Sequence, residues 1–333
     1  MAEKYMSFCE LIFDSVDAST DPFAVALELA RKGLGFTRPN PPVGCVVTKN
    51  GQIIATGHHM KAGGLHAEAQ ALEAAGEHAQ GATLYVTLEP CNHFGRTPPC
   101  TQKIIQSGIR KVIYGVIDPN PQVQGEGIKA LKNAGIEVTQ VADTILRQRA
   151  EALILPFKTW IEKKRPYVIA KIATSLDGKI AFKTGEQTWI TGTQTKALTH
   201  KLREVIDIIG VGSNTALVDK PALTARFNER AAHRQPDTIT FRSKDGLTDT
   251  LEDLGSKGYT SLLLEGGGIM LTAFLKAGLV DEIAWFTAPK ILGNQGVPAI
   301  QELSALYDYS KESFLRQVGV DFLTIVCKKS THG

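Results

Sequence analysis

The stretch from Glu89 to Cys100 decides how this chain folds, and it reads Glu-Pro-Cys-Asn-His-Phe-Gly-Arg-Thr-Pro-Pro-Cys. It follows the β-rich run Leu84–Leu88, and its last cysteine stands where the next helix is expected to begin. Upstream, His66-Ala67-Glu68 stands at the start of another predicted helix. One imidazole and two thiols are typical of a catalytic zinc site, in which three protein ligands leave the fourth position to water. We therefore expect His66, Cys91 and Cys100 to share a zinc ion.

The position of Glu68 adds a chemical role to this site. It lies two residues from His66, so it can reach the metal's water without binding the metal. Zinc lowers the pKa of bound water to about 7, and a neighbouring carboxylate can take the water proton and pass it to leaving ammonia. His-x-Glu followed by Pro-Cys is the zinc deaminase signature, although its cysteines are usually only two residues apart. A coincidental histidine with two buried core cysteines is the alternative, which the combined pattern disfavours.

Length and composition limit the possible classes of protein. The 333 residues exceed the ~250–300 at which single domains stop growing, so two domains are expected. A net charge of +3 without a basic block argues against nucleic-acid binding. Five sparse cysteines argue against a disulfide framework. Residues 1–15 contain neither a signal peptide nor a membrane span, so we expect a cytoplasmic enzyme.

Helix and strand signals alternate along the chain, which predicts α/β domains. Asp21 and Pro22 are typical of a helix start, and Asn50-Gly51 predicts a hairpin between Val43–Thr48 and Gln52–Thr56. We expect an extension (1–20), a first domain of order αββαβαβαβ (21–145), a connector (146–165) and a second domain (166–330). The other expected elements of the first domain are a helix near Cys100, the helix Glu126–Asn133 and the strands Ala82–Leu88, Lys111–Val116 and Ile136–Val141. Those of the second domain are the strands Tyr167–Ala173, Ile206–Gly210, Leu262–Leu264 and Glu282–Thr287, and the helices Thr195–Arg203 and Ile269–Lys276.

Four segments together resemble the bifunctional riboflavin-biosynthesis deaminase–reductase family: Thr37–Gly44, His66–Glu68, Glu89–Cys100 and Asp118–Gly127. The long insert between the two cysteines is what separates this family from plain cytidine deaminases. The resemblance implies an N-terminal cytidine-deaminase-like three-layer domain that removes the 2-amino group of a diaminopyrimidinone carrying a phosphoribosylamino arm.

The same resemblance assigns roles to further residues of the first domain. Asn40 and Asp118 would contact the ring or its ribose, and His59, His93 and Arg96 would contact the phosphate. The residues alone leave turn formation open for Asn40 and Asp118, because Asx-Pro segments often form turns. They also leave the phosphate role of the two histidines undecided.

The second half contains Gly266-Gly267-Gly268 between a predicted strand and a predicted helix. Backbone N–H groups there could approach a dinucleotide pyrophosphate, but a plain tight turn is the alternative, and the pattern is not the Rossmann G-x-G-x-x-G. The resemblance implies a dihydrofolate-reductase-like domain that binds NADPH, with Lys171 and Glu265 as candidate proton donors. It places the cofactor near Ala173, Trp189, Thr215, Asp219, Gly267 and Gly268, and the substrate near Gln187, Arg203, Leu223, Arg226 and Glu265. A core position for Trp189 and a solvated helix position for Arg203 are the alternatives.

Two features of the second half depart from the family pattern. Asp219-Lys220-Pro221 replaces Asp-Asp-Pro, and the stretch between Arg226 and Glu265 is short. The family carries a further strand after Arg234-Gln235-Pro236, whereas here Asp237-Thr238-Ile239 follows directly.

Two other functions remain as alternatives to the riboflavin-pathway enzyme. One is a deaminase of nucleic acids with a C-terminal assembly domain, which the small net charge disfavours. The other is a non-catalytic protein with a structural zinc, which would have no need of Glu68. A small-molecule substrate and a homo-oligomer without membrane or nucleic-acid partners are therefore expected.

Overall fold

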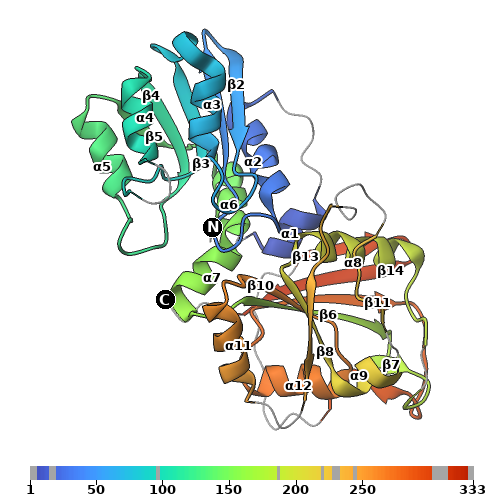
Figure 1. Cartoon of the computed structure of the whole chain (residues 1–333). Coiled ribbons are helices and arrows are strands. Elements are labelled where there is room, and N and C mark those ends of the chain that lie inside the picture. Colours follow the sequence, from blue (N-terminus) through green and yellow to red (C-terminus); the bar gives the residue numbers. More distant parts are fainter. Residues whose placement is uncertain are drawn as a thin grey trace. The chain divides into compact units, whose positions relative to one another are not determined.

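The computed structural model describes residues 6–14, 20–94, 98–185, 188–218, 221–226, 233–242, 246–301 and 314–328. Its contacts divide the chain into two compact units (Figure 1). One comprises Asp14–Lys163, here the deaminase unit, and the other comprises Lys164–Gly333 together with Met1–Phe13, here the reductase unit. No helix in the described part of the chain has the length and hydropathy needed to cross a bilayer.

The deaminase unit is built on a five-stranded sheet in the order β2-β1-β3-β4-β5. The antiparallel hairpin of β1 (Gly44–Lys49) and β2 (Gln52–His58) pairs through β1 with β3 (Thr83–Leu88). The strands β3, β4 (Lys111–Val116) and β5 (Glu137–Gln140) are parallel. Their carboxyl ends therefore meet at one edge of the sheet, which is where ligands bind in open α/β sheets.

Helices cover both faces of this sheet. One layer contains α2 (Pro22–Gly33) and α6 (Thr144–Leu153), and the other contains α3 (Ala67–Ala75), α4 (Cys100–Gln106) and α5 (Glu126–Asn133) (Figure 1). The short 3₁₀ helix η1 (Gly76–Ala79) follows α3, and α7 (Leu155–Lys163) ends the unit. The expected order of elements and the three-layer fold are confirmed.

Local chemistry explains several of these elements. The Asp21 carboxylate accepts the backbone N–H groups of Phe23 and Ala24 and caps α2. Asn50 and Gly51 both have positive φ, as a tight hairpin turn requires. At Gly57, a Cβ would stand 2.2 Å from the Ala67 carbonyl oxygen, so only glycine lets α3 pack this closely on β2.

The reductase unit contains a seven-stranded sheet in the order β13-β14-β11-β6-β10-β8-β9. The strands β11 (Glu282–Ala288), β6 (Tyr167–Ser175), β10 (Ser261–Leu264), β8 (Ile208–Gly212) and β9 (Asp237–Phe241) are parallel. The antiparallel strands β14 (Asp321–Cys327) and β13 (Phe314–Val318) complete one side. A separate pair joins β7 (Lys179–Ala181) to β12 (Val297–Pro298).

Alternation along the strands assigns a helix layer to each face of the sheet. Val168, Ala170 and Ile172 of β6 belong to the core formed with α11 (Leu247–Ser256) and α12 (Gly268–Lys276). Lys171 lies between them and therefore on the other face, where it interacts with the charge of Arg203 on α8 (Thr193–Val205). The short α9 (Ser213–Val218) follows β8 directly. The expected α/β architecture of this domain is thereby confirmed.

The helix α1 (Phe8–Phe13) belongs to the reductase unit, although the deaminase unit follows it in the sequence. Phe8 is fully buried and lies edge-on to the Tyr167 ring. The buried Glu282 carboxylate accepts the Cys9 backbone N–H and the Tyr167 hydroxyl, both at 3.0 Å. This part of the expected N-terminal extension is therefore packed against the reductase sheet.

A strand does follow Arg234-Gln235-Pro236 directly, which corrects the expectation that the strand after this segment is missing. It is β9, and it pairs in parallel with β8. Arg234 fixes the approach to this strand by donating to the carbonyl oxygens of Glu204 and Ile206 at the end of α8. The sequence did not predict the following described elements: α1, η1, α6, α7, β7, α9, β9, α11, β12, β13 and β14.

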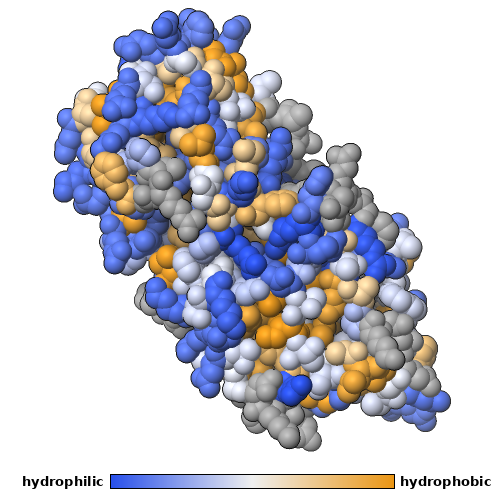
Figure 2. Space-filling model, viewed as in Figure 1, coloured by the Kyte–Doolittle hydropathy of each residue, from blue (hydrophilic) through white to orange (hydrophobic). Residues whose placement is uncertain are grey.

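Hydrophilic side chains cover much of the face shown in Figure 2, with hydrophobic side chains scattered between them. Trp189 is among the exposed large hydrophobic residues, with 69% of its surface accessible. A core position for Trp189 is thereby excluded, and the cofactor-site alternative remains.

Candidate active sites

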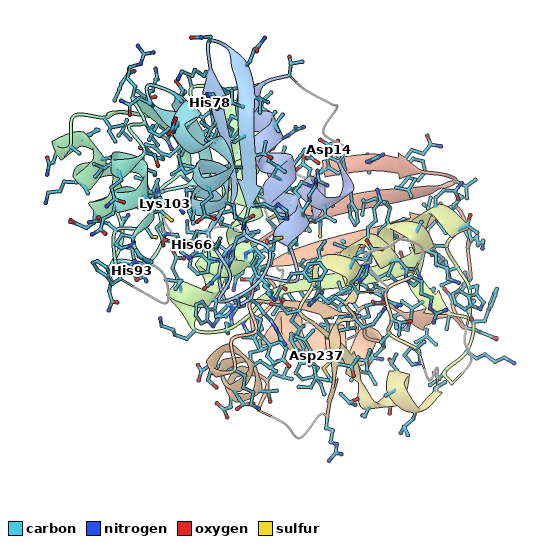
Figure 3. The ribbon with its side chains drawn as sticks, turned by 45° about the horizontal axis from the view of Figure 1, so that its top comes forward. Asp14, His66, His78, His93, Lys103 and Asp237 are labelled. Carbon is cyan, nitrogen blue, oxygen red and sulfur yellow. The ribbon has the colours of Figure 1, made fainter. Side chains whose placement is uncertain are left out.

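Three side chains converge at the carboxyl-end edge of the deaminase sheet. His66 is the N-cap residue of α3, Cys91 follows β3, and Cys100 is the first residue of α4. His66 Nδ1 lies 3.5 Å from Cys91 Sγ and 3.3 Å from Cys100 Sγ. Within the described ranges, they form the one group of His, Cys, Asp and Glu residues able to hold a metal ion. Figure 3 shows His66 and His93 at the same end of the unit.

These distances fit a zinc ion. Tetrahedral zinc with bonds of ~2.3 Å to sulfur and ~2.0 Å to nitrogen places its ligand atoms about 3.5 Å apart. All three ligand atoms lie within 4.8 Å of one another. The donor set of one imidazole and two thiols leaves a fourth position open, which is the catalytic rather than the structural pattern.

The two cysteines share one proton in this arrangement. A hydrogen bond from the Cys100 thiol, together with those from His66 and the Cys100 backbone N–H, lowers the pKa of Cys91 to about 4. The pKa of Cys100 is raised, first by that same hydrogen bond to Cys91 and then by burial. The lowered pKa of Cys91 favours its thiolate, which is the form that ligates zinc.

Glu68 is buried in the first turn of α3, with 4% of its surface exposed. Burial, and then the negative charge of Cys91, raises its pKa to about 7. A carboxyl group with this pKa can both accept and release a proton near neutral pH, as a general acid–base catalyst must.

His59 stands behind the zinc ligand rather than in solvent. It is 2% exposed, and its ring lies edge-on to the His66 ring at 5.4 Å. Its Nδ1 is 3.1 Å from the Leu65 carbonyl oxygen, and its Nε2 is 3.3 Å from Asn40 Nδ2. With Nδ1 donating and Nε2 accepting, both ring nitrogens have protein partners, so a phosphate contact would require these bonds to open.

The other predicted contacts gather beside the cysteines. Asp118 follows β4, and its half-buried carboxylate has a pKa raised first by burial and then by the charge of Glu89. The positive charge that His93 can carry acts in the opposite direction, which places His93 near Asp118. Arg96 lies outside the described residues.

A second cluster in the reductase unit brings together Glu265, which follows β10, Arg203 of α8 and Lys171 in the middle of β6. Arg203 of α8 donates from Nε and Nη2 to the two carboxylate oxygens of Glu265, at 2.6 and 2.9 Å. Its Nη1 donates to the Thr224 carbonyl oxygen at 3.1 Å. Burial raises the pKa of Glu265, but Arg203 more than offsets this and holds it below its usual value. Burial lowers the pKa of Lys171, while the charge of Glu265 opposes this effect.

The predicted substrate loop is held by side chains that the sequence did not single out. Ala225 donates its N–H to Gln235 Oε1 at 2.8 Å, and its carbonyl accepts from Gln235 Nε2 at 3.1 Å. Leu223 in the same loop has a φ of 47°, a conformation that leucine rarely adopts. Arg226 is exposed and donates to Thr224 Oγ1. Because both of these bonds join Gln235 to backbone groups, no sequence motif identifies this contact.

The predicted cofactor residues lie partly together. The Gly267 N–H donates to Thr215 Oγ1 at 3.2 Å, which joins the start of α12 to α9. Gly268 packs closely on the backbone of Pro298 and Ala299. Ala173 is half-buried near the carboxyl end of β6, and the Lys196 ammonium lies over the Trp189 ring. Gln187 and Asp219 lie outside the described residues.

Known protein families match both units. The family described as "Cytidine and deoxycytidylate deaminase zinc-binding region" matches residues 19–116, and the RibD C-terminal domain matches residues 166–247 and 243–318. The riboflavin biosynthesis protein RibD of Aquifex aeolicus is 41% identical over 325 residues, which cover 84% of this chain and 90% of that protein. The chain belongs to the RibD family. It is a bifunctional enzyme of riboflavin biosynthesis, with a zinc-dependent deaminase unit and an NADPH-dependent reductase unit.

Further RibD proteins support this assignment. The Escherichia coli RibD is 37% identical over 355 residues, covering 90% of this chain and 96% of that protein. The crystal structure of a Thermotoga maritima diaminohydroxyphosphoribosylaminopyrimidine deaminase/5-amino-6-(5-phosphoribosylamino)uracil reductase superposes with a TM-score of 0.81 at 35% identity, covering 93% of this chain and 98% of that one. Acinetobacter baumannii RibD gives a TM-score of 0.79 at 32% identity, covering 93% and 99%.

The comparisons also bear on the length of the chain. The alignment with the Escherichia coli RibD is 355 positions long, more than the 333 residues of this chain, so that relative has residues without a counterpart here. The RibD C-terminal domain matches in two segments that overlap at residues 243–247.

Proposed function

We propose that the deaminase unit hydrolyses the 2-amino group of 2,5-diamino-6-(5-phosphoribosylamino)pyrimidin-4-one, and that the reductase unit then converts the ribosyl arm of the product to ribityl with NADPH. The two activities named for the Thermotoga maritima relative support both steps. The observation that carries the proposal is the His66–Cys91–Cys100 cluster beside the buried carboxyl group of Glu68.

In the deaminase step, Glu68 is the proton carrier. Zinc, held by His66, Cys91 and Cys100, supplies a Lewis acid that lowers the pKa of water and so makes hydroxide available at neutral pH. The Glu68 carboxylate takes the proton that water loses and passes it to the leaving amine, which departs as ammonia. His59 orients His66 by packing against its ring, and Asn40 and Asp118 contact the ring or ribose of the substrate.

In the reductase step, NADPH supplies a hydride to the ribose carbonyl carbon of the opened sugar. Lys171 donates the proton that converts the reduced carbonyl oxygen to a hydroxyl. It is the ammonium group beside Glu265, one of the predicted substrate contacts, and it lies on the sheet face that α8 covers. Arg203 holds the Glu265 carboxylate in a fixed orientation through two hydrogen bonds. The exposed guanidinium of Arg226 is then the group left to bind the substrate phosphate.

Product analysis tests both steps. We expect the protein, incubated with the diaminopyrimidine ribotide alone, to release ammonia and give the pyrimidinedione. Adding NADPH should give the ribityl compound together with oxidised cofactor, both identified by mass. A protein that deaminates an RNA or DNA oligonucleotide but not the ribotide would contradict the proposal in favour of a nucleic-acid deaminase.

A cytoplasmic location and a homo-oligomer also remain proposals. The five cysteines are free thiols, which agrees with a reducing compartment.

A further inference from the structure

Glu89 is a buried carboxylate to which no role has been assigned. It is 3% exposed and stands at the end of β3, two residues before the zinc ligand Cys91. Its own backbone N–H donates to the Val116 carbonyl oxygen and extends the pairing of β3 with β4. The position of Glu89 is therefore fixed by the sheet rather than by a loop.

Four backbone N–H groups donate to this carboxylate. Asp118 and Gly125 donate to Oε2 at 3.2 and 3.0 Å. Gly127 and Ile128, in the first turn of α5, donate to Oε1 at 3.0 and 3.2 Å. First-turn N–H groups have no partner within their own helix, and negative charge is favoured at a helix N-terminus. These donors stabilise a charge that burial would otherwise disfavour.

The four donors come from the two ends of one loop, residues 118–128. Asp118 begins the loop where β4 ends, and Gly125–Ile128 close it at α5. The loop also lies directly against the metal-binding segment, because a Cβ on Gly127 would stand 1.9 Å from the Pro90 carbonyl oxygen. One carboxylate thus ties both ends of the loop to the chain that bears Cys91.

We propose that Glu89 is a positioning residue for deamination, which fixes the loop carrying Asp118 at a set place relative to Cys91. This inference rests on the proposed deaminase function and on the substrate contact assigned to Asp118. Loss of the four hydrogen bonds to Glu89 would leave the metal ligands in place, since none of these bonds involves His66, Cys91 or Cys100. It would make the position of Asp118 in the substrate site less fixed, so KM for the substrate would change more than kcat.

The variant Glu89→Gln tests this role at nearly constant volume. The glutamine amide has one acceptor oxygen, so its NH₂ group would face one pair of the N–H donors. We expect KM for the ribotide in ammonia release to rise about tenfold or more, because the hydrogen bonds lost are charge-assisted. We expect kcat to change much less, zinc content to stay as in the wild type, and the amides of Gly125, Gly127 and Ile128 to exchange hydrogen faster.

Two further variants keep the test decisive. Glu126→Gln makes the same change of charge on an exposed side chain of α5 and should alter none of these readings. Gly127→Ala pushes the loop away from Pro90 without a change of charge and should raise KM in the same way. The NADPH-oxidising activity of each protein reports whether the reductase unit has remained folded.

Each result bears on the proposal. The proposal would be overturned if Glu89→Gln and Gly127→Ala both showed the KM and the amide exchange rates of the wild type. Loss of zinc, or a fall in kcat without a rise in KM, in Glu89→Gln would also overturn it. A wild-type protein that releases no ammonia would contradict the proposed function instead. In that case, the amide exchange rates still decide whether Glu89 clamps the loop.

Discussion

Replacing Arg203 with methionine would break the ion pair at the centre of the reductase unit. Arg203 and Glu265 are only 13% and 10% exposed, and two hydrogen bonds of 2.6 and 2.9 Å join them. Methionine keeps most of the apolar stem but removes the guanidinium and both of its hydrogen bonds to the Glu265 carboxylate. Breaking a buried pair in this way costs about 3–5 kcal/mol. Because both groups retain some exposure, we expect a loss of about 3 kcal/mol in the stability of this unit.

The loss should depend on pH in a defined direction. In the wild type, Arg203 holds the pKa of Glu265 below its usual value, so the pair stabilises the fold above the pKa of an unfolded glutamate and this contribution disappears in acid. Without Arg203, the largest influences that lower this pKa are gone, and burial then acts against only the weaker charges of Lys171 and His200, so the pKa rises. The difference in stability between wild type and Arg203→Met should therefore be larger at neutral pH than in acid.

Unfolding in urea, monitored by hydrogen exchange in each unit separately, measures this difference in stability. The units are followed separately because a two-unit chain does not unfold in one step. The double variant Arg203→Met/Glu265→Gln should recover part of the lost stability, because the buried carboxylate is removed together with its guanidinium partner. Arg203→Met, Glu265→Gln and the double variant should all lose NADPH oxidation, while ammonia release should persist. Additive losses of stability in the double-mutant cycle would refute the assignment of an energetically coupled pair.

Three other perturbations test other parts of the molecule. Glu68→Gln should keep its zinc and lower kcat for ammonia release about 10²–10⁴-fold. The control variant Glu73→Gln, which changes an exposed side chain of the same helix, should leave kcat unchanged. Turnover that survives in Glu68→Gln would show that Glu68 is not the proton carrier. The rate of NADPH oxidation should fall as pH rises through the pKa of Lys171, which burial lowers below 10.5. A pH–rate profile whose alkaline fall begins at or above 10.5 would contradict the role of Lys171 as proton donor. Phe8→Ala should destabilise the reductase unit by about 3–5 kcal/mol and leave the deaminase unit unchanged on the same exchange assay; the reverse pattern would show that α1 packs elsewhere.

The metal cluster was predictable from sequence because its geometry is local. His66 and Cys100 start helices and Cys91 ends a strand, and parallel strands bring such positions to one edge of a sheet. The turn at Asn50-Gly51 and the cap at Asp21 were predicted for the same reason, since each depends on a few adjacent residues. The contacts of each side chain with the substrate remain predictions.

The partners of Glu89, Gln235 and Arg203 could not be predicted in this way. The first two bind backbone N–H and C=O groups, which every residue carries, so no residue type at the partner position signals the contact. Arg203 was expected to bind phosphate by its charge, and only the folded chain brings Glu265, 62 positions away, to its guanidinium.

By itself, the sequence determined the chemistry of this protein: which atoms can bind zinc, which carboxyl group lies beside them, and where most strands and helices of the deaminase unit lie. These follow from residue type and short spacing, which act before the chain is compact. Only the tertiary structure decided that α1 packs against the reductase sheet, that β9 lies beside β8, and that one carboxylate holds both ends of the loop from Asp118 to Ile128. Such contacts join residues far apart in the chain, and they form only when burial of apolar surface brings these residues together.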